Sequence, residues 1–549
     1  MRHTRPAVTT ARQPLWIAHL RGTQEQMGEQ HGALLRAHGG WRAALAFYPE
    51  LADRMLFRRA RPRPARAAGR ALVAAMLAEL SRHRPGDYRR RSRAFMRALG
   101  LPAADARSLG VMDALQNCID LAGRLRLGPF ARDLASRMPP ACSTLMVWGA
   151  ASVDGALRHA RNFDFPGIGV WDAAPAVVFC DPDDGLRYGF VTTRGADAVG
   201  VTAFNEAGIS VTAHTRFHRQ CHVSGALVVD VGHDIVRRAE SIADAVRLVR
   251  RRPVASTWGL AVSSARERRA VVIETAGARV AVVEPTRDGM LACANRYRHP
   301  DMLAGQLTLT PCWAYHSDER QARLEALAAA ARARGGMTDA DLRAALGDDV
   351  LAQAATVQSV VIEPEARRVW VATGGCPTSW GPWMAVPWSW DEPVGAHAAA
   401  AGDGDRRTDE AFAAYVEATR IDADTHDDAS ALAAIERAVS LAPDRPDFRF
   451  LAGVLELRFG RLDRALAHFD AGLAHERRAF RRGQLLLWAA RTAAARGDAA
   501  RAAALRDELC ALDHPLLARH RGAARFERER PARATLRPPV PNFLLVDAL

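Results

Sequence analysis

The sequence changes character abruptly at Met138-Pro139-Pro140-Ala141-Cys142, and this change limits the folds that the chain can adopt. Before it, over about residues 15–138, apolar residues recur at helical spacing, as in 16–35, 72–80 and 111–125. After it, apolar residues alternate with a period of two, and tight turns separate the runs. The pattern predicts a helical N-terminal segment that leads directly into a strand-rich region.

The region from Ser143 onward predicts a series of antiparallel hairpins. The first has strands at 143–148 and 157–163 with a turn at Asp154-Gly155. Further strands are predicted at 176–180, 188–193, 201–204, 209–212, 258–263, 270–275, 279–284, 357–363 and 368–372. Helices are expected at about 227–251, 318–334 and 338–346. Many antiparallel strands with inserted helices predict an α+β fold in which two sheets stack and helices cover them.

A low-complexity stretch at 395–408 reads as a linker, and helical repeats follow it over 409–515. Ala465 lies 34 positions after Ala431, and Ala502 lies 37 positions after Ala465. This spacing is typical of tetratricopeptide repeats, in which small residues let paired helices approach closely. A plain helical bundle is the alternative, and residues 516–549 are expected to be irregular.

Charge alone suggests a nucleic-acid partner, because the formal net charge is +14. However, all 75 basic residues are arginine, and they are spread along an Ala- and Arg-rich chain. That distribution is typical of a coding bias with solvated helix faces, so no nucleic-acid partner is expected. The absence of lysine also excludes Schiff-base chemistry and a nucleotide-binding P-loop.

The expected cellular compartment and the expected class of protein follow from signals that are absent from the sequence. The first 16 residues contain no apolar core of a secretory signal, and no run approaches the about 18 apolar residues of a membrane helix. The eight cysteines are irregularly spaced without a CxxC pair, so neither a zinc site nor a disulfide framework is expected. We therefore expect a soluble cytoplasmic enzyme without a membrane partner.

The candidate nucleophile is Cys142, at the start of the first predicted strand. Taken alone, a cysteine at a strand start is more often part of the core. Nineteen residues later the returning strand carries Arg161 and Asp164, which the predicted hairpin brings back beside Cys142. A guanidinium favours a thiolate, and a carboxylate can hold a protonated amine.

The order of motifs resembles the penicillin acyltransferase-like cysteine N-terminal-nucleophile (Ntn) hydrolases, relatives of conjugated bile acid hydrolases that include acyl-CoA:6-aminopenicillanic acid acyltransferase. The resemblance extends over about residues 15–392. It is carried by Gly22–Gly32, Cys142, Arg161 with Asp164, Phe204–Ile209, Asn295, Ser317–Arg320, Ser359–Pro364 and Val371–Pro377. Each motif is unspecific alone, and their order and spacing together are what match.

The resemblance implies a four-layer αββα fold, with residues 1–141 as a pro-segment and 142–394 as the catalytic domain. It implies self-cleavage between Ala141 and Cys142, after which the freed α-amine of Cys142 acts as the base. A free α-amine has a pKa of about 7.7–8.0, so no catalytic histidine, cofactor or metal is required. Asp164 is expected to hold the amine, and Arg161 to stabilise the thiolate or bind a substrate carboxylate. Asn205 and Asn295 are the candidate oxyanion-hole donors, and Arg320 is a further site candidate.

The resemblance leaves the substrate open among amide hydrolysis, acyl transfer to an amine and acyl-CoA use. Arg296 and Cys293 depart from the usual pattern around Asn295 and could alter pocket specificity. We expect a small amide or acyl substrate, and a protein partner could bind the repeats. The alternatives are a catalytically silent shell that acts as a repeat adaptor, and a papain-like enzyme, which would need a histidine and a helix at the cysteine.

Overall fold

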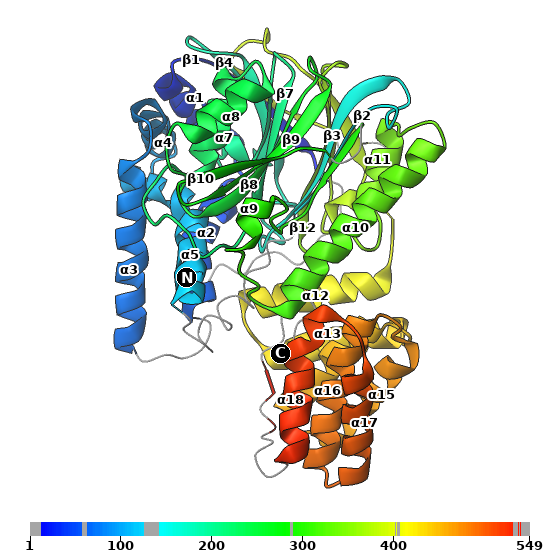
Figure 1. Ribbon diagram of the computed structural model, residues 1–549. Helices are drawn as coiled ribbons and strands as arrows, with labels where there is room; N and C mark the ends of the chain where they lie inside the picture. Colours follow the sequence, from blue (N-terminus) through cyan, green and yellow to red (C-terminus); the bar gives the residue numbers. More distant parts are fainter. Residues whose placement is uncertain are drawn as a thin grey trace. The chain divides into compact units, whose positions relative to one another are not determined.

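The computed structural model describes residues 13–57, 63–125, 142–285, 289–400, 402, 407–530, 536 and 538–539. The chain forms two compact units (Figure 1). The first unit contains the residues up to Leu307 together with Ser317–Arg407, and the second contains Thr308–His316 and Thr408–Leu549. Each unit is described separately below.

The first unit contains a nine-stranded sheet. Its strands, in spatial order, are β10 (Arg279–Val283), β9 (Arg269–Ala276), β8 (Thr257–Ser264), β7 (Ile209–Thr215), β6 (Thr202–Asn205), β5 (Tyr188–Thr193), β4 (Pro175–Pro182), β1 (Leu15–Gly22) and β15 (Gly395–Ala399). Neighbouring strands are antiparallel apart from β1 and β4, which run parallel with Ile17 opposite Val177.

A six-stranded antiparallel sheet carries the first predicted hairpin. Its order is β11 (Met290–Cys293), β2 (Ser143–Gly149), β3 (Gly155–Asp164), β12 (Thr356–Glu363), β13 (Arg368–Ala372) and β14 (Trp383–Pro387). Thr144 lies opposite Arg161 in the β2–β3 pair, so the hairpin prediction is confirmed. The turn reaches Gly155 at φ 73°, in the left-handed region that glycine adopts most readily.

The two sheets pack face to face, and helices cover their outer faces (Figure 1). Between the sheets, Phe179 of the large sheet packs in one cluster with Val360 and Ile362 of the small sheet. Helices α1 (Gln24–His38), α4 (Gly86–Ala98), α7 (Val228–Arg238) and α8 (Ile242–Arg250) cover the large sheet. Helices α10 (Pro311–Ala333) and α11 (Asp339–Leu346) cover the small sheet. The prediction of two stacked, mainly antiparallel sheets covered by helices is confirmed.

The remaining helices of this unit are short or lie towards its N-terminal part. They are α2 (Arg42–Phe57), α3 (Arg63–Arg82), α5 (Val111–Arg124) and α9 (Pro300–Leu303), with 3₁₀ helices η1 (Ala103–Gly110), η2 (Val199–Val201) and η3 (Thr378–Trp380). In the described residues none of the helices combines the length and apolar character that a membrane span needs.

Two helix predictions are wrong in their detail. Residues 15–22 form strand β1 rather than the start of a helix, and α1 begins only after a capping box of Thr23 and Gln26. Leu15 to Leu20 are all buried, and a strand buried on both faces has a continuous apolar run that periodicity cannot distinguish from a helix. The helix expected at 227–251 is two helices, because α7 ends at Arg238 and Ser241 caps α8.

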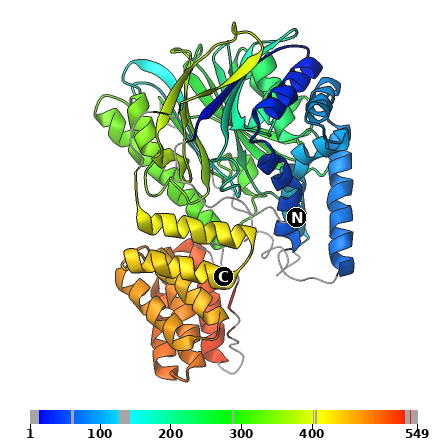
Figure 2. The ribbon, with the colours of Figure 1, turned by 180° about the vertical axis from the view of Figure 1, so that it is seen from behind.

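The predicted linker and irregular tail are also corrected. Gly395–Ala399 forms β15, whose backbone pairs with β1, and Figure 2 shows the two strands side by side. Its Gly-Ala composition hid the strand, because edge pairing here depends on the backbone rather than on apolar side chains. Ala518–Glu529 forms helix α18 within the tail expected to be irregular. The edge strands β11 and β14 were not predicted.

The second unit is helical. Its helices are α12 (Glu410–Asp424), α13 (Asp428–Leu441), α14 (Pro446–Arg458), α15 (Leu462–His475), α16 (Ala479–Ala495), α17 (Ala499–Ala511), η4 (Pro515–Leu517) and α18. Successive helices pack as α12 with α13, α14 with α15, and α16 with α17. Gly453 of α14 lies so close to Phe469 of α15 that an added Cβ would meet the ring at 2.5 Å.

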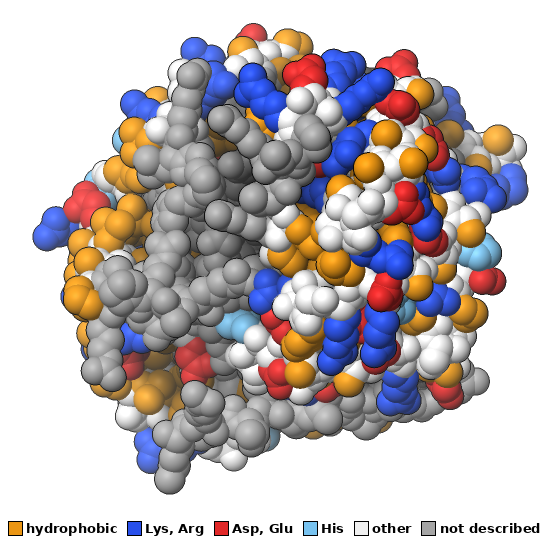
Figure 3. All heavy atoms as spheres, turned by 90° about the horizontal axis from the view of Figure 1, so that it is seen from below, with side chains coloured by type: hydrophobic (Ala, Val, Ile, Leu, Met, Phe, Trp, Pro, Cys, Tyr) orange, Lys and Arg blue, Asp and Glu red, His pale blue; other side chains and the backbone are white. Residues whose placement is uncertain are grey.

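Arginine side chains do not separate from acidic ones on the face shown in Figure 3. In its described part, blue and red side chains are interspersed. Paired charges are a feature of the second unit, as in Arg482–Glu508 and Arg501–Asp470, each at 2.5 Å. Interspersed charge of this kind does not form the basic stripe typical of nucleic-acid binding.

Candidate active site

Cys142 lies directly before β2 and is 2% exposed. Its Sγ accepts a hydrogen bond from Arg161 Nη2 at 3.6 Å, and its carbonyl oxygen accepts one from Arg320 Nη1 at 2.6 Å. The two arginines therefore hold the cysteine from its side chain and from its backbone. Ala141, the other residue of the predicted cleavage site, lies outside the described residues.

Arg161 is anchored between the two sheets. From β3 its guanidinium donates to the backbone oxygens of Val201 and Ala213, the latter at 2.7 Å, and to Thr202 Oγ1. Its Cζ lies 4.8 Å from the centre of the Phe163 ring. Burial lowers the pKa of Arg161, while the neighbouring Cys142 raises it. The result is a fixed, desolvated cation beside the sulfur.

Asp164 closes the end of β3 on the same side as Cys142. Its Oδ1 accepts a hydrogen bond from Thr356 Oγ1 at 2.6 Å, whereas its buried Oδ2 has no hydrogen-bond partner among the described residues. Burial raises the pKa of Asp164 to about 7, against the lowering effect of Arg320, Thr356 and Arg161. One carboxylate oxygen is thus left available for a hydrogen-bond donor that the described residues do not supply.

Arg320 and Asn295 are joined to the same site. Arg320 Nη1 also donates to Ser143 Oγ at 3.0 Å, and its Nη2 donates to Asn295 Oδ1 at 2.9 Å. Asn295 Nδ2 donates to the Thr215 carbonyl oxygen at 3.2 Å, which uses one of its two N–H groups. The second N–H remains a candidate donor to an oxyanion. Ser143 and Thr356 were not predicted, because a lone hydroxyl residue in a strand carries no sequence signal.

Asn205 is the predicted site residue that the structure does not bring to Cys142. Its Nδ2 donates to the carbonyl oxygens of Val236 and Ala239, both at 2.9 Å, and its Oδ1 accepts from the Ile209 amide. Both N–H groups are occupied by backbone at the end of α7, so Asn205 has no donor left for an oxyanion. Its prediction as an oxyanion-hole residue is corrected to a structural role in the β6–β7 turn.

Two buried histidines lie between the sheets near this site. His159 contacts Ser263 Oγ at 2.9 Å and Thr212 Oγ1 at 3.1 Å, and His214 Nε2 contacts Thr144 Oγ1 at 2.9 Å. Burial, followed by the charge of Arg161, lowers the pKa of His159 to about 3 and that of His214 well below its usual value. Both rings are therefore neutral at physiological pH. Cys142 precedes a strand rather than a helix, which also contradicts the papain-like alternative.

A cavity of about 70 Å³ opens beside Cys142 and Asp164. Its walls come from both sides of the predicted cleavage point. The segment before it contributes residues of α2, η1 and α5, and the segment after it contributes residues of β3, β7, β8 and α7. Any substrate held here would therefore touch both parts of the chain.

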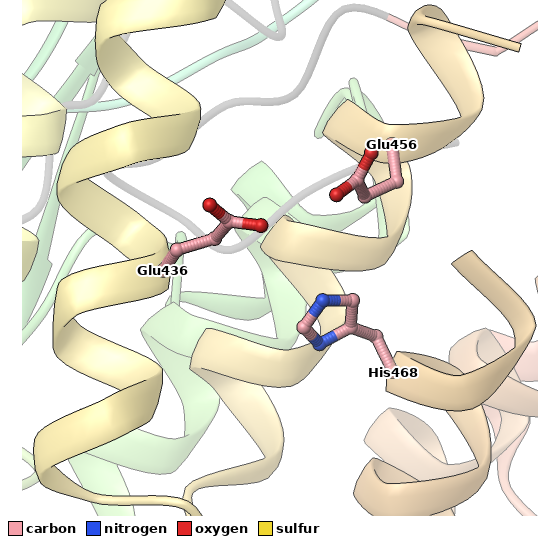
Figure 4. A group of neighbouring side chains, drawn as sticks. All are labelled: Glu436, Glu456 and His468. Atoms are coloured by element: carbon pink, nitrogen blue, oxygen red, sulfur yellow. The ribbon is translucent and has the colours of Figure 1, made fainter. Parts of the chain in front are cut away.

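One group of side chains in the second unit has the composition of a metal site. Glu436, Glu456 and His468 turn towards one another from α13, α14 and α15, with one possible ligand atom of each within 4.8 Å of the others (Figure 4). However, Arg464 is ion-paired with both carboxylates, and its Nε lies 2.8 Å from Glu456 Oε1. Arginine already compensates these charges, and a cation would have to displace it.

Residues 160–375 match the family model described as acyl-coenzyme A:6-aminopenicillanic acid acyl-transferase. Comparison with curated protein sequences finds no significant match. Among solved structures, a Caenorhabditis elegans N-acylethanolamine-hydrolyzing acid amidase (NAAA) ortholog is 16% identical with a TM-score of 0.31, and the match covers 41% of this chain and 93% of that one. This likeness is too distant to carry an argument. The family match covers less than half of the chain, and within it lie Arg161, Asp164, Asn205, Asn295 and Arg320, while Cys142 lies outside it.

Proposed function

We propose that this protein is a cysteine Ntn hydrolase or acyltransferase that cleaves itself between Ala141 and Cys142 and then acts on a small amide or acyl substrate. The observation that carries the proposal is the pairing around Cys142: Arg161 donates to its sulfur, and Asp164, whose Oδ2 has no hydrogen-bond partner among the described residues, lines the cavity beside it. An α-amine freed at Cys142 would supply the hydrogen-bond donor that Asp164 lacks. The family match from residue 160 onward supports the same reaction class.

Self-cleavage begins with attack of the Cys142 thiol on the carbonyl carbon of Ala141. The C–S bond forms, the C–N bond breaks, and the thiol proton ends on the released α-amine. Water then hydrolyses the thioester, which returns the thiol and leaves a carboxylate on Ala141. Arg320 holds the Cys142 carbonyl and therefore fixes the orientation of the backbone next to the bond that breaks.

Turnover uses the same sulfur. The α-amine takes the thiol proton, and the thiolate attacks the acyl carbon of the substrate. The second N–H of Asn295 donates to the oxyanion, and loss of one such donor typically costs about 2.7–4 kcal/mol of barrier. The amine returns its proton to the leaving group, and water or an acceptor amine resolves the Cys142 thioester. Because the base belongs to the nucleophile itself, neither His159 nor His214 takes part.

We also propose that the helices of the second unit form a tetratricopeptide-like repeat region that binds a protein partner. Ala431, Ala465 and Ala502 are all buried, and they lie in the second helix of three successive pairs. This placement of small residues supports the repeat assignment over an unpatterned bundle.

Mass spectrometry under denaturing conditions tests the proposed cleavage. Scaling 59.7 kDa by residue number, 141 and 408 of 549, predicts chains of about 15 and about 44 kDa. Cys142→Ala is expected to remain a single chain without turnover, and Cys142→Ser to cleave slowly because a hydroxyl is a weaker nucleophile. Cys293→Ala is the matched control, since Cys293 is equally buried but hydrogen-bonds Arg216. An intact active wild-type chain would refute self-cleavage, and an intact inactive one would favour the adaptor alternative.

A further inference from the structure

Apart from Asp164, a second carboxyl group interrupts the apolar lining of the cavity beside Cys142. Most of the wall is apolar or aromatic, and it includes Phe163, Phe165, Trp171 and Trp258. Asp113 of α5 lines the same space and is completely buried. A carboxyl group in such surroundings is costly unless its oxygens are paired.

Only one oxygen of Asp113 is paired. Oδ1 accepts hydrogen bonds from Trp258 Nε1 at 3.0 Å and from the Val228 amide at 3.3 Å. Oδ2 is buried and has no hydrogen-bond partner among the described residues. Trp258 and Val228 also line the cavity. Their hydrogen bonds to Oδ1 fix the carboxyl group and leave Oδ2 available to a ligand.

None of the described residues forms an ion pair with Asp113. Arg84 interacts with it electrostatically but donates to Asp230 at 2.8 and 2.9 Å and to Ser92 at 3.1 Å. Among the described residues that line the cavity, Asp113 and Asp164 carry carboxyl groups and none is basic. Burial raises the pKa of Asp113 to about 8, with Asp230 adding to the rise and the Val228 and Trp258 hydrogen bonds opposing it.

We propose that Asp113 is a specificity residue that binds a basic amino group on the substrate, carried on the part that enters the cavity. The inference rests on the proposed function, because it assigns a substrate class to the Cys142 site. A buried carboxylate with aromatic rings around it is the chemistry that recognises ammonium groups. Asp113 also lies in the first turn of α5, where the helix dipole favours its charged form once a cation is present.

Direct binding to the full-length protein tests the inference without requiring turnover. Calorimetric titrations at pH 7 compare n-hexylamine with 1-hexanol, which has the same chain and no charge. We expect the amine to bind at least about tenfold more tightly, because the O–H of hexanol can donate only a neutral hydrogen bond, whereas the ammonium group can also form an ion pair with Asp113. Equal or weaker binding of the amine by the wild-type protein overturns the inference.

Proton release provides a second readout. Amine binding is expected to discharge a proton from Asp113, so the measured heat should change with the ionisation enthalpy of the buffer, whereas hexanol binding should not. Asp164 lines the same cavity and can also titrate, so the comparison is repeated with Asp113→Asn. That substitution keeps the acceptor for Trp258 and replaces Oδ2 by an N–H donor. It should remove the preference for the amine and lower the proton release.

Asp120→Asn is the matched control. Asp120 is another buried carboxyl group on α5, but Thr257 and the His218 amide occupy both of its oxygens, and it does not line the cavity. The Asp120→Asn variant should retain the preference of the wild-type protein for hexylamine. An uncleaved wild-type chain that still prefers hexylamine would contradict the proposed reaction and leave the ammonium site standing. A cleaved active enzyme that binds hexanol as well as hexylamine would contradict only the ammonium site.

Discussion

At the scale of single residues, the site combines fixed cations with carboxyl groups that lack one partner. Arg161 and Arg320 are both buried and hold Cys142 from two directions. Asp164 and Asp113 each have one buried oxygen without a hydrogen-bond partner among the described residues. Buried polar groups are normally hydrogen-bonded, and these two oxygens are the acceptors that the proposed α-amine and the proposed substrate ammonium group would use.

Substitution of Asp164 tests which group acts as the base. Asp164→Asn should lower the turnover rate by about 10²-fold or more, because the α-amine loses the carboxylate that orients it. A carboxylate also favours the protonated amine, so its removal should shift the residual pH–rate profile to lower pH. At pH 8 the free energy of unfolding of the Asp164→Asn variant should not be lower than that of the wild-type protein. Burial raises the pKa of Asp164 to about 7, so its charge disfavours the folded state as pH rises through that value.

His159→Gln and His214→Gln are the comparison variants for this test. Both histidines are buried and neutral and hydrogen-bond hydroxyl groups, so turnover should stay within about tenfold of the wild-type rate. Loss of turnover in either histidine variant, with Asp164→Asn nearly neutral, would mean that a histidine is the base.

At the scale of secondary-structure elements, helices α1 and α4 bind the segment that follows β5 and pack closely against each other. His31 of α1 and Arg91 of α4 both bind Asp197, at 3.0 Å and at 2.8 Å. Burial opposes the charge of Asp197, but Arg91 and His31 hold its pKa far below the usual range. Gly28 and Gly32 of α1 face the backbone of α4, where an added Cβ would meet Arg91 O at 2.2 Å or Phe95 O at 2.5 Å. These contacts give a physical reason for Gly28 and Gly32 within the Gly22–Gly32 motif.

Gly32→Ala is therefore expected to lower the free energy of unfolding by about 1–3 kcal/mol, because the backbone of α4 must move away. Thermal or denaturant unfolding of the full chain measures the change. Gly522→Ala is the control, since an added Cβ at this helical position in α18 meets nothing within 4 Å. It should be neutral or stabilise by up to about 1 kcal/mol. Equal effects of the two substitutions would show that α1 and α4 do not require close approach.

At the scale of the whole molecule, neither of the two compact units is one continuous stretch of the sequence. All the proposed site residues lie in the first unit, but residues 308–316, from the middle of the chain, belong to the second. Tyr315 at the start of α10 stacks on Phe480 at 4.6 Å, and Cys312 contacts Gln484 Nε2 at 2.6 Å. A short segment from the middle of the chain thus takes part in the core of the helical unit.

Truncation after Arg407 tests this arrangement. The shortened chain should still cleave itself, because the described site residues are retained, but it should associate because Cys312, Trp313 and Tyr315 lose their cover. Size-exclusion chromatography and intact mass measure both outcomes. Tyr315→Ser in the shortened chain should reduce the association. A monomeric shortened chain with unchanged thermal stability would show that residues 308–316 do not depend on the second unit.

Much of the small sheet and its hairpin followed from alternation and turn residues, because β2, β3 and the β12–β13 hairpin depend on local signals. Strand β1 did not, since burial on both faces removes the alternation, and β15 did not, since backbone pairing with β1 leaves little trace in its side chains. The hairpin after Cys142 is also a local signal. The spacing of Arg161 and Asp164 after Cys142 therefore predicted that the hairpin would bring these residues together.

The sequence by itself determined the break before Cys142, the hairpin that follows it and the chemical types of the residues beside the sulfur. Only the tertiary structure decided which polar residues retain a free atom. Asn205 donates both amide hydrogens to backbone oxygens, whereas Asn295 donates one to the described residues. Asp113 lines the cavity from a helix on the other side of the predicted cleavage point. Hydrogen-bond saturation and burial depend on contacts between segments far apart in the chain, and no local pattern encodes them.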